Sequence, residues 1–404
     1  MRTGLFTSSI AKIYASNFLT GLVFWYGIEK LFMQHIGITP FGIGVATVGY
    51  YAVALLADVP AGLLADKWSR KGVLVLSTIC LLVSSVICGT SHSLWQYIVG
   101  YMFYGLYIVC TSGTYQALTY DTLHEQNRAG DYSKIIGRAY ALFMVGAGVA
   151  NIGSGLIAHV GGMRLPFLLS VIPCALNAVL ILTIAEPQFH KREQKERVLR
   201  QLGQSIRIMA RTAIVRSLVV MWCVFAVAAP FEQEFSQLYM LRFTQSPIVV
   251  GFLWAAAAAM FAIGSWAAHR ARKQFAWHVA AALVLLIALG LTTHVWGLAL
   301  FFGQIIFAQV AFNHIETHVQ HATPSGVRTS VMSVLSSLGR VVELPCAIVF
   351  GWLINRYGIF VMLRVLAVVS AVGLLYWVIV GVRRLADVQL DGGEEVLVET
   401  VAKP

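Results

Sequence analysis

The chain has 404 residues, of which 58% are hydrophobic and 12% are charged, and its formal net charge is +11. Soluble globular chains carry about 25% charged and about 45–50% apolar residues, so this composition excludes an ordinary soluble enzyme, a disordered protein and a nucleic-acid-binding module. The 6 cysteines lie in apolar stretches without a CxxC or Cys/His cluster, which predicts buried thiols rather than a disulfide framework or a zinc site.

Apolar runs long enough to cross a membrane follow one another along almost the whole chain. A hydrocarbon core of about 30 Å takes about 20 apolar residues in a helix, and about twelve such runs are present. We expect spans at residues 13–34, 41–64, 73–91, 94–118, 138–160, 164–185, 214–241, 247–268, 275–293, 296–318, 329–354 and 358–381. The sequence therefore predicts an all-α membrane protein, with most loops too short to hold a domain.

Residues 186–213 form the one long polar segment between spans. Basic side chains are frequent there, and five apolar residues recur at helical spacing: Val198, Leu199, Leu202, Ile206 and Met209. This pattern predicts a basic amphipathic helix on the membrane surface, and a solvated linker is the alternative. We expect it to join an N-terminal six-helix bundle, residues 1–185, to a C-terminal one, residues 214–385, with a cytoplasmic tail at 386–404.

Basic residues are distributed unequally over the loops. With both termini in the cytoplasm, the inner loops receive most of them, including the whole 186–213 segment. The outer ends receive only Lys30, Arg164, Arg242, Arg356 and Arg364. The positive-inside rule predicts this orientation, so the excess charge marks topology and attraction to lipid, not a nucleic-acid partner. We expect a multi-pass protein of a bacterial inner or plasma membrane.

The two halves of the chain resemble each other in three places. Residues 31–40 match 238–247, residues 62–71 match 264–273, and the Thr-Ser-His sequence at 90–92 matches Thr-Thr-His at 292–294. The matches keep their order and nearly constant spacing. Two parallel halves imply a pseudo-twofold axis along the membrane normal with a cavity between the halves, as in carriers that alternate access.

The loop after the second span contains a specific motif. Gly62, Asp66, Lys67, Arg70 and Lys71 follow the pattern Gly-x-x-x-Asp-Lys-x-Ser-Arg-Lys. It resembles the cytoplasmic signature of the major facilitator superfamily, except that a serine replaces the usual second glycine. The resemblance covers essentially the whole chain. It implies two six-helix bundles, a secondary transporter and neither a catalytic site nor a cofactor.

The resemblance also implies a conformational switch at this loop. Its members would be Asp58, Gly62, Asp66, Arg70, Lys71 and Asp121. We expect Gly62 to allow close helix approach and Asp66 to cap the eleventh helix, which starts near residue 328. Arg70 would pair with Asp121 at the inner end of span four. The alternative is a static clamp that does not break during transport.

The second half carries a decayed copy of the motif. Arg272 and its neighbouring lysine remain, and Glu316 near the inner end of span ten would mirror the acid of span four. His314 and His318 share a helix face at i,i+4, which is also metal-ligand spacing. Because no HExxH pattern accompanies them, we expect interfacial polar groups or minor proton carriers and no metal site.

A few charges lie inside the predicted spans, where each costs about 2.5–3.5 kcal/mol on insertion scales. These residues are Glu29 in span one, Glu232 and Glu234 in span seven, and Arg340 and Glu343 in span eleven. α-Helical geometry places Glu232 and Glu234 about 200° apart, so only one of them can face a cavity squarely. Arg340 either pairs locally with Glu343 or meets an acid of span seven until a substrate or proton releases it.

Aromatic residues of several spans are expected to give the cavity walls an aromatic character. They are Trp25, Tyr26, Tyr101, Tyr104, Tyr107, Phe231 and Trp254. Aromatic walls with few charges suit an amphipathic solute, whereas plain helix packing is the alternative for each residue.

The expected function is transport of a small amphipathic solute by a monomer. The resemblance to drug and metabolite exporters favours proton-coupled efflux, with Glu232 or Glu234 as the coupling carboxylate and Glu29 next. The span-four arginine of those exporters is absent, and the span-five motif keeps its glycines without its proline. Inward symport or uniport and a non-transporting sensor are the alternatives. No phosphate-binding loop is present, so ATP is not the expected energy source.

Overall fold

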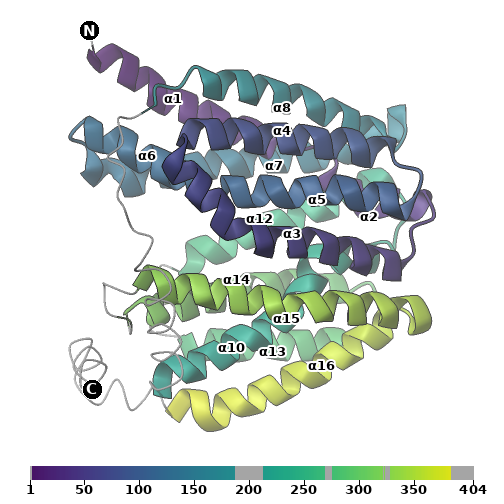
Figure 1. Cartoon of the computed structure of the whole chain (residues 1–404). Coiled ribbons are helices and arrows are strands. Elements are labelled where there is room, and N and C mark those ends of the chain that lie inside the picture. Colours follow the sequence, from purple (N-terminus) through teal and green to yellow (C-terminus); the bar gives the residue numbers. More distant parts are fainter. Residues whose placement is uncertain (1, 187–212, 269–274, 322, 324–327, 384–404) are drawn as a thin grey trace. The chain divides into compact units, whose positions relative to one another are not determined.

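The computed structural model of the chain describes residues 2–186, 213–268, 275–321, 323 and 328–383. In these ranges the regular structure is helical and contains no strand. The expected amphipathic helix at 186–213 and the tail at 386–404 lie almost wholly outside them. The described chain packs into two compact units, and in Figure 1 the helices of each unit run lengthwise beside one another.

Unit 1 consists of residues Met1–Arg192 and Gln237–Ala258. Its elements are α1 (Arg2–Gly21), η1 (Tyr26–Ile28), α2 (Glu29–His35), α3 (Pro40–Lys67), α4 (Arg70–Thr90), α5 (Leu94–Thr111), α6 (Thr114–Glu125), η2 (Ala129–Asp131), α7 (Tyr132–Gly161), α8 (Leu165–Leu182), most of α11 (Ser236–Met240) and the first half of α12 (Pro247–Ala268). The end of span seven and the start of span eight therefore pack with the N-terminal helices, across the boundary expected from the sequence.

Unit 2 consists of residues Glu193–Ser236 and Ala259–Pro404. Its elements are α10 (Ala213–Pro230), the π-helical turn η3 (Phe231–Phe235), the rest of α12, α13 (Phe275–Leu291), α14 (Gly297–His321), α15 (Arg328–Tyr357), α16 (Ile359–Tyr376) and the π-helical turn η5 (Trp377–Gly381). A core centred on Trp222, Phe225, Phe275 and Trp377 joins α10, α13, α14 and α15.

Every predicted span contains helix, and among the described residues nine helical segments are long and apolar enough to cross a membrane. Two predictions of single unbroken helices are wrong. Span one is interrupted at residues 22–25, between α1 and η1. Span four is interrupted after Thr111, where Gly113 has φ 73°, a backbone conformation that glycine adopts readily.

Hydroxyl side chains begin three helices of unit 1. Thr39 Oγ1 accepts from Gly42 N–H at the start of α3, and Ser69 Oγ accepts from Gly72 N–H, 2.8 Å away, at the start of α4. Ser93 does the same for α5. The serine that departs from the family signature is therefore a helix N-cap, because its hydroxyl satisfies a backbone donor that a glycine would leave open.

Glycines bring α1 and α7 into backbone contact. A Cβ at Gly21 would clash with the backbone of Phe143 and Ala147, and a Cβ at Gly146 would clash with the carbonyl of Phe18. Gly155, farther along α7, meets the backbone of Pro247 in the same way. Two of the span-five glycines, Gly146 and Gly155, therefore serve close packing against α1 and α12.

Candidate functional site

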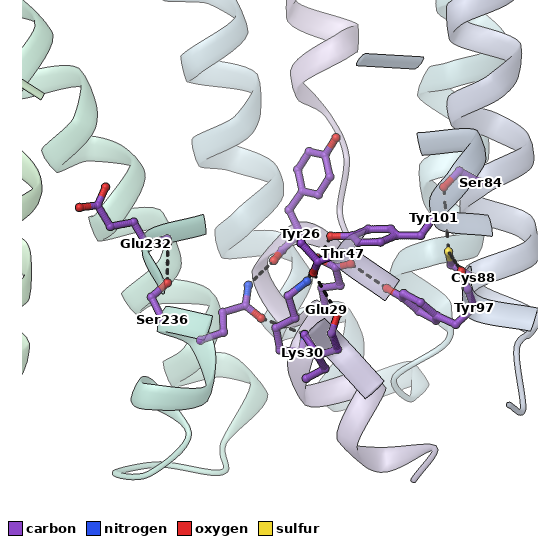
Figure 2. Close-up of polar contacts among 12 residues, drawn as sticks. Tyr26, Glu29, Lys30, Thr47, Ser84, Cys88, Tyr97, Tyr101, Glu232 and Ser236 are labelled. Atoms are coloured by element: carbon purple, nitrogen blue, oxygen red, sulfur yellow. Dashed lines mark hydrogen bonds and ion pairs between the residues drawn. The ribbon is translucent and has the colours of Figure 1, made fainter. Parts of the chain in front are cut away.

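The break in span one presents a buried ion pair to the interior of unit 1. Glu29 and Lys30 begin α2, and their side chains are almost wholly buried. Lys30 Nζ lies 3.1 Å from Glu29 Oε2 and donates to the Tyr101 hydroxyl at 3.2 Å. The Tyr97 hydroxyl donates to Glu29 Oε1 at 2.7 Å, and Figure 2 shows these groups converging.

The sequence places Lys30 with Glu29 in the outer third of span one. The structure adds that Lys30 is 1% exposed. A charge buried this deeply is tolerated when it is paired and hydrogen-bonded. The adjacent acid and the tyrosine of α5 supply those partners. Glu29 is therefore tied into a closed set of contacts rather than held ready as a lone carboxylate.

Side chains of α3 and α5 surround the break with aromatic rings. Tyr104 is the hub, since its ring centroid lies within 6 Å of those of Trp25, Tyr26, Tyr50, Tyr101 and Tyr107. Tyr50 was not among the aromatic residues predicted from the sequence, although its place in the largely apolar span two was a usable signal.

Trp25 does not line a cavity wall as predicted. Its side chain is 0% exposed, its indole Nε1 donates to Ser85 Oγ at 3.0 Å, and its ring stacks on Phe167. Packing between α4 and α8 therefore accounts for this residue. Tyr26 and Tyr104 are half-buried, so each keeps a surface that a solute can touch.

A second polar centre lies in unit 2, at the π-helical turn of span seven. Glu232 is half-buried, and its Oε1 accepts a hydrogen bond from Gln304 Nε2 of α14 at 2.6 Å. Gln304 is 0% exposed, and its Oε1 finds no hydrogen-bond partner among the described residues. Among the described residues, no cationic side chain pairs with the Glu232 carboxylate.

Three further charges lie near one another in unit 2. Glu234 is 5% exposed, whereas its neighbour Gln233 is exposed. The Glu343 carboxylate interacts electrostatically with both Arg340 and Glu234. The contact of Glu343 with Arg340 agrees with the local pair of span eleven, and Glu234 of span seven is a like charge near Glu343. Glu232 stays apart from these charges, in contact with span ten.

At the start of α4, the predicted ion pair between Arg70 and Asp121 is present. Arg70 Nη1 also donates to the Ala117 carbonyl at 3.1 Å, so the guanidinium joins α4 to α6. An arginine in the first turn of a helix opposes the helix dipole, and the acid of α6 compensates for it. Burial raises the pKa of Asp121, while the guanidinium beside it acts to lower that pKa.

The other residues of the switch motif are Asp58, Gly62, Asp66 and Lys71. A Cβ at Gly62 would meet no described atom within 4 Å, so the described part of the chain shows no close helix approach at this glycine. Lys71 Nζ contacts the Leu182 carbonyl at 3.5 Å, and Asp58 is half-buried. The side chain of Asp66 lies outside the described residues.

The structure describes only one of the two residues predicted for the second-half copy of the motif. Glu316 accepts a hydrogen bond from Gln320, one turn farther along α14, at 3.3 Å. Arg272 falls in the gap between residues 268 and 275, so the structure does not describe the expected partner.

The predicted histidine pair of α14 lies inside unit 2. His314 is 3% exposed, His318 Nδ1 lies 2.8 Å from the His314 carbonyl oxygen, and His318 stacks on Phe275. His314 is therefore a packed residue rather than an interfacial one. In the described ranges no group of three or more histidine, cysteine or acidic side chains is arranged to hold a metal ion. All 6 cysteines are free thiols, four of them buried.

Comparisons with known proteins agree with this architecture. The family model described as Major Facilitator Superfamily matches residues 10–344. An uncharacterized transporter of Buchnera aphidicola subsp. Acyrthosiphon pisum is 28% identical over 136 residues, which are 33% of this chain and 33% of that protein. An uncharacterized MFS-type transporter of Methanocaldococcus jannaschii is 23% identical over 198 residues, 48% of this chain and 50% of that protein. The matched region thus spans between a third and a half of these relatives.

Solved structures resemble the chain over nearly its full length. The nucleoside transporter NupG superposes with a TM-score of 0.72 at 13% identity, covering 93% of this chain and 98% of that one. A D-xylose-proton symporter gives a TM-score of 0.70 at 13% identity, covering 91% and 97% of the two chains. A bacterial homolog of the human lysosomal transporter Spinster gives 0.68 at 16% identity, covering 94% and 95%. At these identities the likeness establishes the fold alone.

Proposed function

This chain belongs to the Major Facilitator Superfamily and is a multi-pass membrane transporter, and we propose that it exports a small amphipathic solute in exchange for protons, with Glu232 as the coupling carboxylate. The asymmetry of basic residues supports a bacterial inner membrane with both termini in the cytoplasm. We expect it to work as a monomer by rocking of its two halves.

The observation that carries the proposal is the setting of Glu232. It lies in a π-helical turn within a spanning segment, and π turns recur at functional sites. Its described polar partner is the neutral amide of Gln304, which donates one hydrogen bond. An ionised carboxylate without a cation is costly in a membrane span. Binding a proton removes that charge, and releasing it restores an anion that can respond to a solute.

The aromatic surroundings of span one support the solute class. Tyr26, Tyr50 and Tyr104 are half-buried and combine ring faces with hydroxyl groups. Such side chains offer apolar contact area and a hydrogen bond at one end. A solute with an apolar ring system and a few polar groups complements them, whereas a highly charged solute does not.

Thermal stabilisation of the purified chain by a panel of amphipathic compounds would identify a binder, because a ligand that binds the native state raises the melting temperature. Everted membrane vesicles then test coupling. We expect them to accumulate that compound when the lumen is acidified, and to stop when the gradient is collapsed. Accumulation driven by the opposite gradient would contradict export, and gradient-independent equilibration would contradict coupling.

Matched carboxylate variants then test the residue. We expect Glu232→Gln to abolish gradient-driven accumulation while retaining binding of the compound. Glu234→Gln serves as the neighbouring control on the same span. Wild-type accumulation by Glu232→Gln would refute the assignment.

A further inference from the structure

A side chain of span seven occupies the place of a missing backbone hydrogen bond in span one. In an uninterrupted α-helix the Lys30 N–H donates to the Tyr26 carbonyl, four residues earlier. Here Gln237 Oε1 accepts from Lys30 N–H at 3.0 Å, and Gln237 Nε2 donates to the Tyr26 carbonyl at 2.5 Å. One amide thus satisfies both ends of the backbone bond that is missing at the junction of η1 and α2, just after the interruption at residues 22–25.

The amide also supplies a cap that the local sequence lacks. Lys30 lies in the first turn of α2, where backbone N–H groups have no partner within the helix. Ile28 is the N-cap residue and its apolar side chain makes no capping hydrogen bond. Gln237 is 2% exposed, so water does not compete for these groups. A carboxamide fits because it presents an acceptor and a donor side by side.

Span seven is itself irregular at this point. The π-helical turn Phe231–Phe235 ends two residues before Gln237. In the internal repeat, Gln237 is the counterpart of Lys30, since residues 31–40 match 238–247. The two counterpart residues of the broken spans are therefore in direct contact. An inserted side chain of this kind is a recognised cause of an interrupted helix.

We propose that Gln237 is a positioning residue for the transport cycle, which holds span one open at the junction of η1 and α2 while its amide is inserted and lets this junction close into regular α-helix when the amide withdraws. On withdrawal, Lys30 N–H and the Tyr26 carbonyl bond to each other, so neither backbone group is left unsatisfied in either state. Closing the helix turns Lys30 and Glu29 relative to Tyr97 and Tyr101. The proposal depends on the chain being a transporter and not on proton coupling at Glu232.

Hydrogen–deuterium exchange of the full chain in lipid nanodiscs tests this directly. Peptides covering residues 26–33 report on the Lys30 amide in wild type, Gln237→Leu and Gln237→Ala. We expect slower exchange in both variants, because the Lys30 backbone N–H moves from the start of a helix into a continuous series of α-helical hydrogen bonds. The control is Gln245→Leu, which loses only a hydrogen bond to Leu241 of the same segment and should match wild type.

A static role predicts the opposite result. If Gln237 merely fills a permanent break, its loss leaves Lys30 N–H without a partner and speeds exchange roughly tenfold. Faster or unchanged exchange would overturn the proposal. If Gln237→Leu lacks a cooperative melting transition, Gln237→Ala decides by the same criterion, and failure of both to fold counts against a switch. Glu232→Gln should leave these peptides unchanged, which keeps this test separate from proton coupling.

Discussion

Spans one and seven are counterparts in the internal repeat, yet they hold their acids in different ways. Glu29 lies beside Lys30 in the chain and receives a second contact from the Tyr97 hydroxyl. Glu232 receives one hydrogen bond, from the amide of Gln304. The first acid has a cationic partner 3.1 Å away in its own unit, whereas the second depends on a neutral group of another helix. An acid in a span is therefore not by itself a coupling site.

The energetic consequences of the two arrangements are opposite. Removing one member of a buried ion pair leaves an uncompensated charge, which is strongly destabilising. Neutralising a carboxylate that has only a hydrogen bond costs little, because the bond survives in the neutral state. The pair in unit 1 should thus dominate stability and the acid in unit 2 should dominate coupling. The following variants separate these two roles.

The largest effect is expected from Lys30→Met. Loss of the ammonium group strands Glu29 in a buried site, which should reduce the free energy of unfolding by about 3–5 kcal/mol. Reversible unfolding in mixed micelles would measure this.

The double variant Lys30→Met with Glu29→Gln is the matching control. It removes both charges, so we expect most of the stability to return. A single variant as stable as wild type would mean that the pair contributes nothing to the fold of unit 1.

The second effect concerns the packing of α1 against α7 in unit 1. Gly146→Ala places a methyl group against the Phe18 carbonyl and should destabilise the chain by about 1–3 kcal/mol through overpacking. Gly148→Ala is the control in the same helix, since nothing lies within 4 Å of its Cβ. Equal melting temperatures for the two variants would contradict close packing of α1 on α7.

A smaller effect is expected from Gln304→Leu in unit 2. The variant removes the donor to Glu232 and should lower the free energy of unfolding by about 1 kcal/mol. It should also shift the pH dependence of solute binding, because the carboxylate loses its described polar partner. Unchanged pH dependence would separate Gln304 from the coupling site.

Glu232→Gln should have the smallest effect on stability, below about 1 kcal/mol, since the amide keeps an oxygen that can accept from Gln304. Its melting temperature should therefore match that of wild type while gradient-driven transport is lost. A large loss of stability would place Glu232 with the structural acids such as Glu29.

The sequence predicted the helical spans well because hydrophobic length is a strong local signal, and it predicted the contact of Arg70 with Asp121 through a family motif. It did not predict the breaks in spans one and four. Apolar composition runs through residues 22–25 without change, and the partner that bridges Tyr26 and Lys30 just after them is Gln237, more than 200 positions away. Contacts between distant segments leave no periodic trace in one sequence.

The candidate site was predicted in part for the same reason. Intramembrane charges are visible by type, so Glu29 and Glu232 were found, but their partners were not. Trp25 was assigned to a cavity because span one lines the cavity in the family, whereas its side chain packs against Ser85 of α4 and Phe167 of α8. The π turn at Phe231–Phe235 likewise changes the angular spacing that an α-helix would give Glu232 and Glu234.

We propose that Glu232 carries the exchanged proton and that Glu29 does not. Proton release on addition of the stabilising solute, recorded with a pH-sensitive dye in weakly buffered detergent, tests it most directly. We predict about one proton per bound solute for wild type and for Glu29→Gln with Lys30→Met, and none for Glu232→Gln. Release that persists in Glu232→Gln and disappears in the double variant would contradict the account.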